Sequence, residues 1–128
     1  MPQRLSRLTR SSDFQRIYRR GSSTASRFLV LYSFKRAQDA GGEAPRLGLS
    51  VSKKLGGAVV RNRVKRLLRE AFMRSAQELS GEYDLVLIAR PQLLDLLARE
   101  DAGEKGLVND AARDLFRRAG LLTEADNT

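Results

Sequence analysis

The residues with the greatest capacity for chemistry lie in one basic segment, residues 53–74. Its basic residues are Lys53, Lys54, Arg61, Arg63, Lys65, Arg66, Arg69 and Arg74, and its only acid is Glu70. With about 100° between successive helical residues, one face of this segment is apolar and the opposite face carries Asn62, Arg66 and Arg69. Lys65 lies at the edge of that face. A guanidinium group binds two phosphate oxygens at once, so the pattern predicts a phosphate-rich partner.

An ordinary solvated helix is the alternative interpretation of this pattern. Exposed helices usually place opposite charges four residues apart, where the charges attract each other. Asn62 with Arg66, and Lys65 with Arg69, offer no such opposite charges. Because closely spaced like charges destabilise a helix, we favour a binding face over a solvated one.

A second group of residues combines aromatic rings with cations. The rings are Phe14, Tyr18, Tyr32 and Phe34, and the interleaved cations are Arg16, Arg19, Arg20 and Lys35. Aromatic rings stack on unpaired bases, while neighbouring cations bind the nucleic-acid backbone. The alternative is that these rings belong to the core, which is the usual place of any single ring in a small domain. The residues alone leave both interpretations open.

Several classes of catalyst are excluded by residue types that the chain lacks. It has no histidine and no cysteine, which rules out imidazole bases, Ser-His-Asp triads, disulfides and thiolate metal sites. The carboxylates of the basic half are few and scattered. Gly56 and Gly57 lack the GxxxxGKS/T spacing of a P-loop. We therefore expect no catalytic residue and no metal bound by this chain alone.

Length and charge describe one domain with an uneven surface. The chain has 128 residues, a net charge of +9 and a pI near 10.8. Residues 1–74 hold 18 Lys/Arg and four acids, a net +14, whereas residues 75–128 hold six Lys/Arg and 11 acids, a net −5. This polarity is expected of a protein that presents one face to a polyanion. Without an apolar run of ~18 residues or an apolar leader, we expect a cytoplasmic protein and no membrane partner.

The N-terminal half predicts a short helix and two strands. The helix covers residues 14–20, with N-cap candidates at residues 11–13 and Gly21 at its end. Residues 28–36 predict a strand in which Phe28, Val30, Tyr32 and Phe34 share one face. Residues 46–52 predict a second strand, paired antiparallel with the first through the intervening turn.

The rest of the chain predicts a long helix, a buried strand and a last helix. The long helix covers residues 58–79, and its apolar stripe consists of Val60, Val64, Leu67, Leu68, Ala71 and Phe72. The apolar run 83–89 predicts a strand covered on both faces, which Pro91 ends. Residues 92–106 are ambiguous between a helical turn and a loop. Asn109 or Asp110 is the expected cap of a last helix that stops at Gly120.

Three segments resemble the protein subunit of bacterial ribonuclease P. They are RLTRSSDFQRIYRRG, RLGLSVSKKLGGAVVRNRVKRLLREAF and YDLVLIARP, and the resemblance covers about residues 4–91 in the same order. It implies a single α+β domain like that of a ribosomal protein. The implied domain has a mixed sheet of about four strands, an N-terminal helix, the Arg-rich helix in a left-handed βαβ crossover, and a C-terminal helix. Residues 1–8 and 123–128 are expected to be flexible.

The resemblance also implies a function and its residues. The family removes the 5′ leader of precursor tRNA; its RNA subunit cleaves the phosphodiester bond with magnesium, and the protein acts as a cofactor that lowers the magnesium requirement. The implied contacts to the catalytic RNA are Arg61, Asn62, Arg63, Lys65, Arg66 and Arg69. The implied contacts to the single-stranded leader are Phe14, Tyr18, Tyr32 and Lys53. The chain departs from the family in having Tyr18 where phenylalanine is usual and in the length of residues 92–106.

Two other function classes compete with this interpretation. A structural ribosomal or chaperone-like RNA-binding protein fits the composition and charge equally well, but it does not require the VRNRVKR helix together with the upstream rings. A protein-only nuclease would cleave without added RNA, and the missing histidines and scattered acids argue against it. We expect partners to be the catalytic RNA and precursor tRNA, and not DNA.

Overall fold

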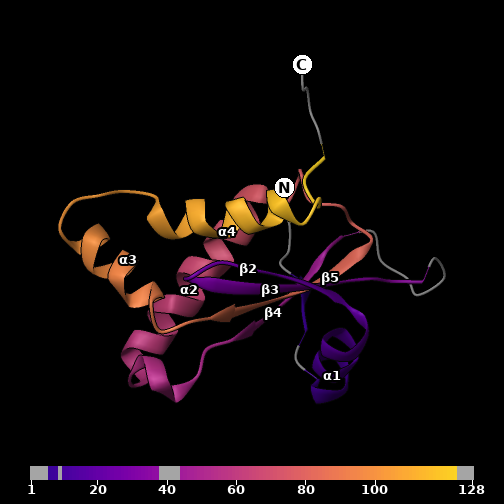
Figure 1. Ribbon diagram of the computed structural model, residues 1–128, viewed down its shortest axis with the longest axis horizontal. Coiled ribbons are helices and arrows are strands. Elements are labelled where there is room, and N and C mark those ends of the chain that lie inside the picture. Colours follow the sequence, from indigo (N-terminus) through magenta and orange to yellow (C-terminus); the bar gives the residue numbers. More distant parts are fainter. Residues whose placement is uncertain (1–5, 9, 38–43, 124–128) are drawn as a thin grey trace.

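A computed structural model describes residues 6–8, 10–37 and 44–123 of the chain. These residues form a mixed sheet with helices on both faces (Figure 1), which confirms the predicted α+β class. The elements are β1 (Ser6–Arg7), α1 (Ser11–Arg20), β2 (Ser22–Ala25), β3 (Leu29–Lys35), β4 (Arg46–Ser50), α2 (Ala58–Ser75), β5 (Tyr83–Ala89), α3 (Leu93–Asp101) and α4 (Leu107–Arg118). A 3-10 turn, η1 (Lys53–Leu55), connects β4 to α2.

The strands are ordered β1-β4-β5-β3-β2, so the short β1 extends the expected set of about four to five. β4 pairs parallel with β1 and β5, whereas β3 pairs antiparallel with β5 and β2. The predicted hairpin between residues 28–36 and 46–52 is therefore wrong, because β5 lies between these strands. The continuous apolar run of β5 needs cover on both faces, and the middle of a sheet supplies it. The parallel crossover from β4 through α2 to β5 agrees with the resemblance, and its hand stays a prediction.

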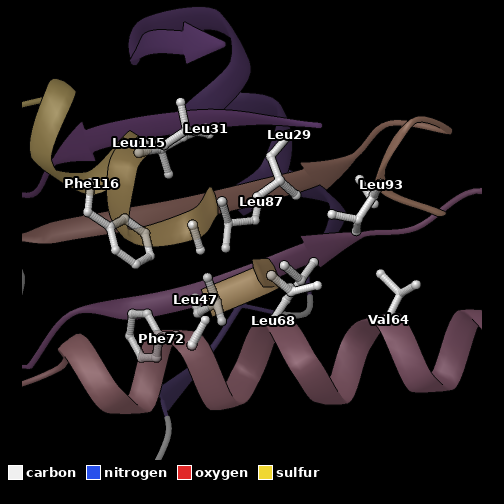
Figure 2. Packing of buried hydrophobic residues seen from close by; sticks show 14 of the residues in the cluster. Leu29, Leu31, Leu47, Val64, Leu68, Phe72, Leu87, Leu93, Leu115 and Phe116 are labelled. Carbon is white, nitrogen blue, oxygen red and sulfur yellow. The ribbon is translucent and has the colours of Figure 1, made fainter. Parts of the chain in front are cut away.

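The larger core lies between the sheet and helices α2, α3 and α4 (Figure 2). Leu47 of β4 and Leu87 of β5 point from the sheet into this core. Val64 and Leu68 point into it from α2, and both are fully buried. The predicted apolar stripe of α2 is thus confirmed, because its 3.6-residue period places these side chains on one face.

A smaller core lies on the other face of the sheet, beneath α1. It contains the buried side chains of Leu8, Ile17 and Val86. Tyr32 and Phe34 pack against it from β3, as the strand alternation predicts. The prediction that Phe28 shares this face is wrong: Phe28 lies before the first residue of β3 and packs against the larger core.

Several helix boundaries differ from the predictions. α1 begins at Ser11 and its N-cap is Arg10, with no side-chain cap, so residues 11–13 lie inside the helix. α2 ends at Ser75 rather than Leu79, and Leu79 instead forms an isolated bridge with Leu122.

The ambiguous residues 92–106 contain α3 followed by a loop. α4 begins at Leu107, so neither Asn109 nor Asp110 is its cap. The carboxylate of Glu100 caps this helix instead, accepting a hydrogen bond from the Val108 amide at 2.9 Å. A cap supplied by a neighbouring helix leaves no local sequence pattern, which explains the missed boundary.

The described parts of both end segments contact the rest of the fold, and the flexibility of these segments stays a prediction. Ser6–Arg7 pairs with β4, and Leu8 is buried. Near the other end, the Thr123 amide donates to the Glu78 carbonyl oxygen at 2.6 Å. Residues 1–5 and 124–128 of the segments expected to be flexible lie outside the described residues.

Candidate nucleic-acid interface

Helix α2 presents polar side chains opposite the apolar side chains that it buries. Asn62 and Arg66 are exposed, while Lys65 and Arg69 are half-exposed beside them. We call these four residues the basic face of α2. Within the described part of the chain, the side chains of Asn62, Lys65 and Arg69 have no hydrogen-bond or ion-pair partner. Their polar groups are therefore available to a ligand.

Two arginines of the predicted set contact the protein itself. Arg61 Nε donates to the Gly56 carbonyl oxygen at 3.2 Å. The Arg63 guanidinium donates to both carboxylate oxygens of Asp101, at 2.7 and 3.2 Å. The hydrogen bonds from Arg63 lower the pKa of Asp101 below its ordinary value. Arg63 therefore ties α2 to the end of α3, and its partner lies in the segment that the sequence left ambiguous.

Arg66 has an acidic neighbour that the sequence argument overlooked. Its Nε lies 3.8 Å from a carboxylate oxygen of Glu70, one helical turn later. Both side chains are more than half exposed, at 62% and 54%. An exposed i,i+4 pair of this kind contributes little, about 0.3–0.5 kcal/mol. The Arg66 guanidinium is therefore held weakly and can exchange Glu70 for a phosphate.

On the other face of the sheet, three of the predicted rings gather around α1. The rings of Tyr18 and Tyr32 meet edge to face with centroids 5.0 Å apart, and Phe14 lies 6.3 Å from Tyr18. We call Phe14, Tyr18 and Tyr32 the ring cluster. Tyr18 is 38% exposed, whereas the other two are half-buried. Both interpretations of the rings are therefore partly correct: Phe14 and Tyr32 pack against the smaller core, and Tyr18 is exposed to solvent.

The hydroxyl of Tyr18 lies near the end of β4. Partial burial raises the pKa of Tyr18, and a hydrogen bond with the Ser50 side chain opposes that rise. Ser50 is the last residue of β4, and the predicted contact Lys53 follows it in η1, where its side chain is exposed. The ring cluster and one predicted cation therefore lie at the same end of β4.

Phe34 is separated from the ring cluster. The Arg16 guanidinium lies over its ring, with a distance of 4.9 Å to the centroid. In the sheet, Phe34 pairs with Asp84, whereas Tyr32 pairs with Val86. Of the four rings that the sequence grouped together, Phe34 is the one already covered by a cation of this protein.

Gly48 determines how closely Phe14 approaches the sheet. A Cβ at position 48 would lie 2.5 Å from Phe14 Cε1. We expect Gly48→Ala to lower the free energy of unfolding by about 1–3 kcal/mol in urea titrations, because the ring must move or α1 must shift. Gly57→Ala is the control for steric clash, since nothing lies within 4 Å of its Cβ position; as the N-cap of α2 it loses only the preference for glycine there, which is a smaller effect. Equal stability of both variants would contradict this packing.

Asp84 is a central residue of this face that the sequence analysis missed. Its side chain is fully buried, yet it accepts hydrogen bonds from Arg16, Arg36 and Arg46 at 2.7–3.2 Å. Burial alone would raise the pKa of Asp84, but the three guanidinium groups outweigh it and the pKa is lowered. The carboxylate therefore joins α1 to β4 and to the residue that follows β3. An acid within an otherwise apolar strand was the signal available in the sequence.

Among the described residues, no group of three or more Asp or Glu side chains is placed to hold a metal ion. The same residues contain no helix with the length and apolarity of a transmembrane span.

The fold and these surfaces define a small basic α+β protein with an arginine-rich helix on one face of its sheet and a cluster of aromatic rings on the other. A family model described as Ribonuclease P matches residues 1–107. The ribonuclease P protein component of Clostridium novyi (strain NT) is 39% identical over 115 residues, covering 90% of this chain and 94% of that protein. The corresponding protein of Bacillus velezensis is 40% identical over 121 residues, covering 94% and 95%.

Solved structures agree with the sequence relatives. The ribonuclease P protein of Staphylococcus aureus superposes with a TM-score of 0.78 at 32% identity, covering 94% of this chain and all of that one. The protein from Thermotoga maritima superposes with a TM-score of 0.75 at 29% identity, covering 88% and 96%. The chain belongs to the family of bacterial ribonuclease P protein components. It is thus a subunit of an endoribonuclease with a role in the 5′ processing of precursor tRNA.

Proposed function

We propose that the chain binds two RNAs at once, the catalytic RNA on the basic face of α2 and the single-stranded 5′ leader on the ring cluster. The observation that carries this proposal is the arrangement of the two surfaces. α2 packs against one face of the sheet and α1 against the other (Figure 1), so neither ligand obstructs the other. Lys53 and Lys54 lie in the turn that leads from β4 to α2.

Charge neutralisation explains how such a protein assists a catalytic RNA. Two RNAs that meet in one active site repel each other, and cations must be recruited to reduce that repulsion. Residues 1–74 carry a net charge of +14, which replaces part of this requirement. The protein therefore lowers the magnesium concentration needed for cleavage, while the bond-breaking chemistry stays with the RNA and its magnesium ions.

Reconstitution tests the proposed function directly. The assay combines this protein, a cognate catalytic RNA and a precursor tRNA at low magnesium, with each component omitted in turn. We expect cleavage only when all three are present, and recovery of cleavage by RNA alone when magnesium is raised. Cleavage by the protein without the catalytic RNA would indicate a protein nuclease, and RNA binding without any stimulation of cleavage would indicate a structural RNA-binding protein.

Tyr18 separates leader binding from general RNA affinity. We expect Tyr18→Ala to weaken precursor tRNA binding to the holoenzyme about tenfold, since one ring–base stack contributes about 1–3 kcal/mol. Binding of mature tRNA, which lacks the leader, stays unchanged. Filter-binding titrations with both RNAs give the ratio of the affinity for precursor tRNA to the affinity for mature tRNA. Tyr18→Phe keeps the ring and retains most of the precursor affinity, whereas an equal loss for both RNAs would overturn the leader assignment.

A further inference from the structure

Val59 is an apolar side chain with no place in either core. It is the second residue of α2 and is 84% exposed. Among the described residues, Val59 and Tyr18 are the two large apolar side chains that stay exposed. Tyr18 already belongs to a proposed RNA contact. Single exposed apolar residues are common. Whether Val59 marks a binding contact therefore depends on its position relative to its polar neighbours.

That position is at the head of the basic face of α2. Val59 precedes Asn62 by three residues and Arg66 by seven, and residues at these spacings share one side of a helix. Its own exposure shows that the surface around it is open to solvent. A ligand that reaches Asn62 and Arg66 therefore also covers the methyl groups of Val59.

The fold itself gains nothing from valine at this position. A β-branched residue loses side-chain freedom in a helix, and its methyl groups here are in water. The other residues at these spacings along the face, Asn62 and Arg66, are polar or charged. An apolar group that is costly in the free protein is explained if a partner buries it.

We propose that Val59 is an apolar contact of the RNA interface and packs against the ribose or base of an unpaired nucleotide of the catalytic RNA. The inference rests on the proposed function, because the positive charge around Val59 is the reason for taking RNA as its ligand. The cationic neighbours bind phosphates, and the valine buries the carbon-rich part of the same nucleotide. Burial of apolar surface is independent of counterion release, so this contact contributes affinity that salt does not weaken.

Salt titration of Val59→Thr tests the proposal. Threonine keeps the branching of valine but has a hydroxyl in place of one methyl group, so it reduces the apolar contact with little change in helix propensity. We expect affinity for the catalytic RNA to fall about three- to tenfold at every salt concentration, with the slope of log K against log salt unchanged. Ala98→Ser on the exposed side of α3 is the control and leaves affinity unchanged.

The outcomes distinguish this inference from the proposed function. Affinity of Val59→Thr within twofold of the parent, or a loss that changes the salt slope, overturns the apolar contact. If a variant that lacks Arg66 and Arg69 also binds the catalytic RNA normally, the basic face is not the interface and the proposed function fails as well. Unfolding in urea is expected to match the parent, because Val59 contacts neither core.

Discussion

Asp84→Asn is expected to lower the free energy of unfolding by about 3–5 kcal/mol. The substitution keeps the shape of the side chain but removes the charge that three arginines share. The Arg36 side chain is 4% exposed, so its cation would stay buried beside a neutral amide. Removing one partner of a buried ion pair costs this much because the remaining charge is uncompensated. Urea titration followed by circular dichroism measures the change.

The same contact predicts a dependence of stability on pH. The pKa of Asp84 is lower in the folded protein than in the unfolded chain, so the folded state binds fewer protons at acidic pH. Its stabilisation is fully present above the unfolded value, about pH 4, and is lost as the pH falls through the folded pKa. We expect Asp84→Asn to remove this part of the acid dependence.

Asp101→Asn is the matched control for Asp84→Asn. Asp101 also pairs with an arginine, but its side chain is 62% exposed. Solvent screens an exposed pair and leaves it little net effect, so this variant should unfold close to the parent. Equal effects of the two substitutions would show that the buried carboxylate does not join α1 to the sheet.

The second large effect is expected from the double variant Arg66→Ala with Arg69→Ala. Loss of two phosphate contacts should weaken binding of the catalytic RNA about 100-fold at low salt, since each charge-assisted contact contributes about 1.5 kcal/mol. The slope of log K against log salt should become shallower by about 1.4–1.8, because two fewer counterions are released. Both side chains are solvent-accessible, so stability should change little.

A charge-matched control distinguishes these contacts from net charge. Arg99→Ala with Arg117→Ala also removes two positive charges, from exposed positions on α3 and α4 where each arginine pairs with an acid. We expect this variant to bind the catalytic RNA within about threefold of the parent. Comparable losses in the two double variants would mean that the RNA responds to total charge and not to the basic face of α2.

The elements predicted best were those whose own sequence has a clear pattern of apolar residues. The apolar run 83–89 matches β5 residue for residue, and the stripe through Val64 and Leu68 identified the buried side of α2. In both cases the spacing of the apolar residues by itself predicts which side chains are buried. The basic face followed from the same period, since it is the side opposite that stripe.

The failures share a different physical origin, which is contact between distant segments. The hairpin between residues 28–36 and 46–52 failed because a strand nearly 40 residues later is inserted between them. The partners of Arg63 and Asp84 come from other elements, and no local spacing encodes them. The rings showed the same limit: stacking geometry, and not composition, separated Phe34 from Tyr18.

The central place of β5 has a consequence for biosynthesis. It is the last strand to leave the ribosome, yet it joins the β1–β4 pair to the β3–β2 pair. Two isolated two-stranded ribbons are marginally stable in water, so the nascent chain cannot complete its sheet until residue 89 has emerged. The arginine-rich helix is therefore made, and exposed to the RNA of the translating cell, before the scaffold that will hold it exists.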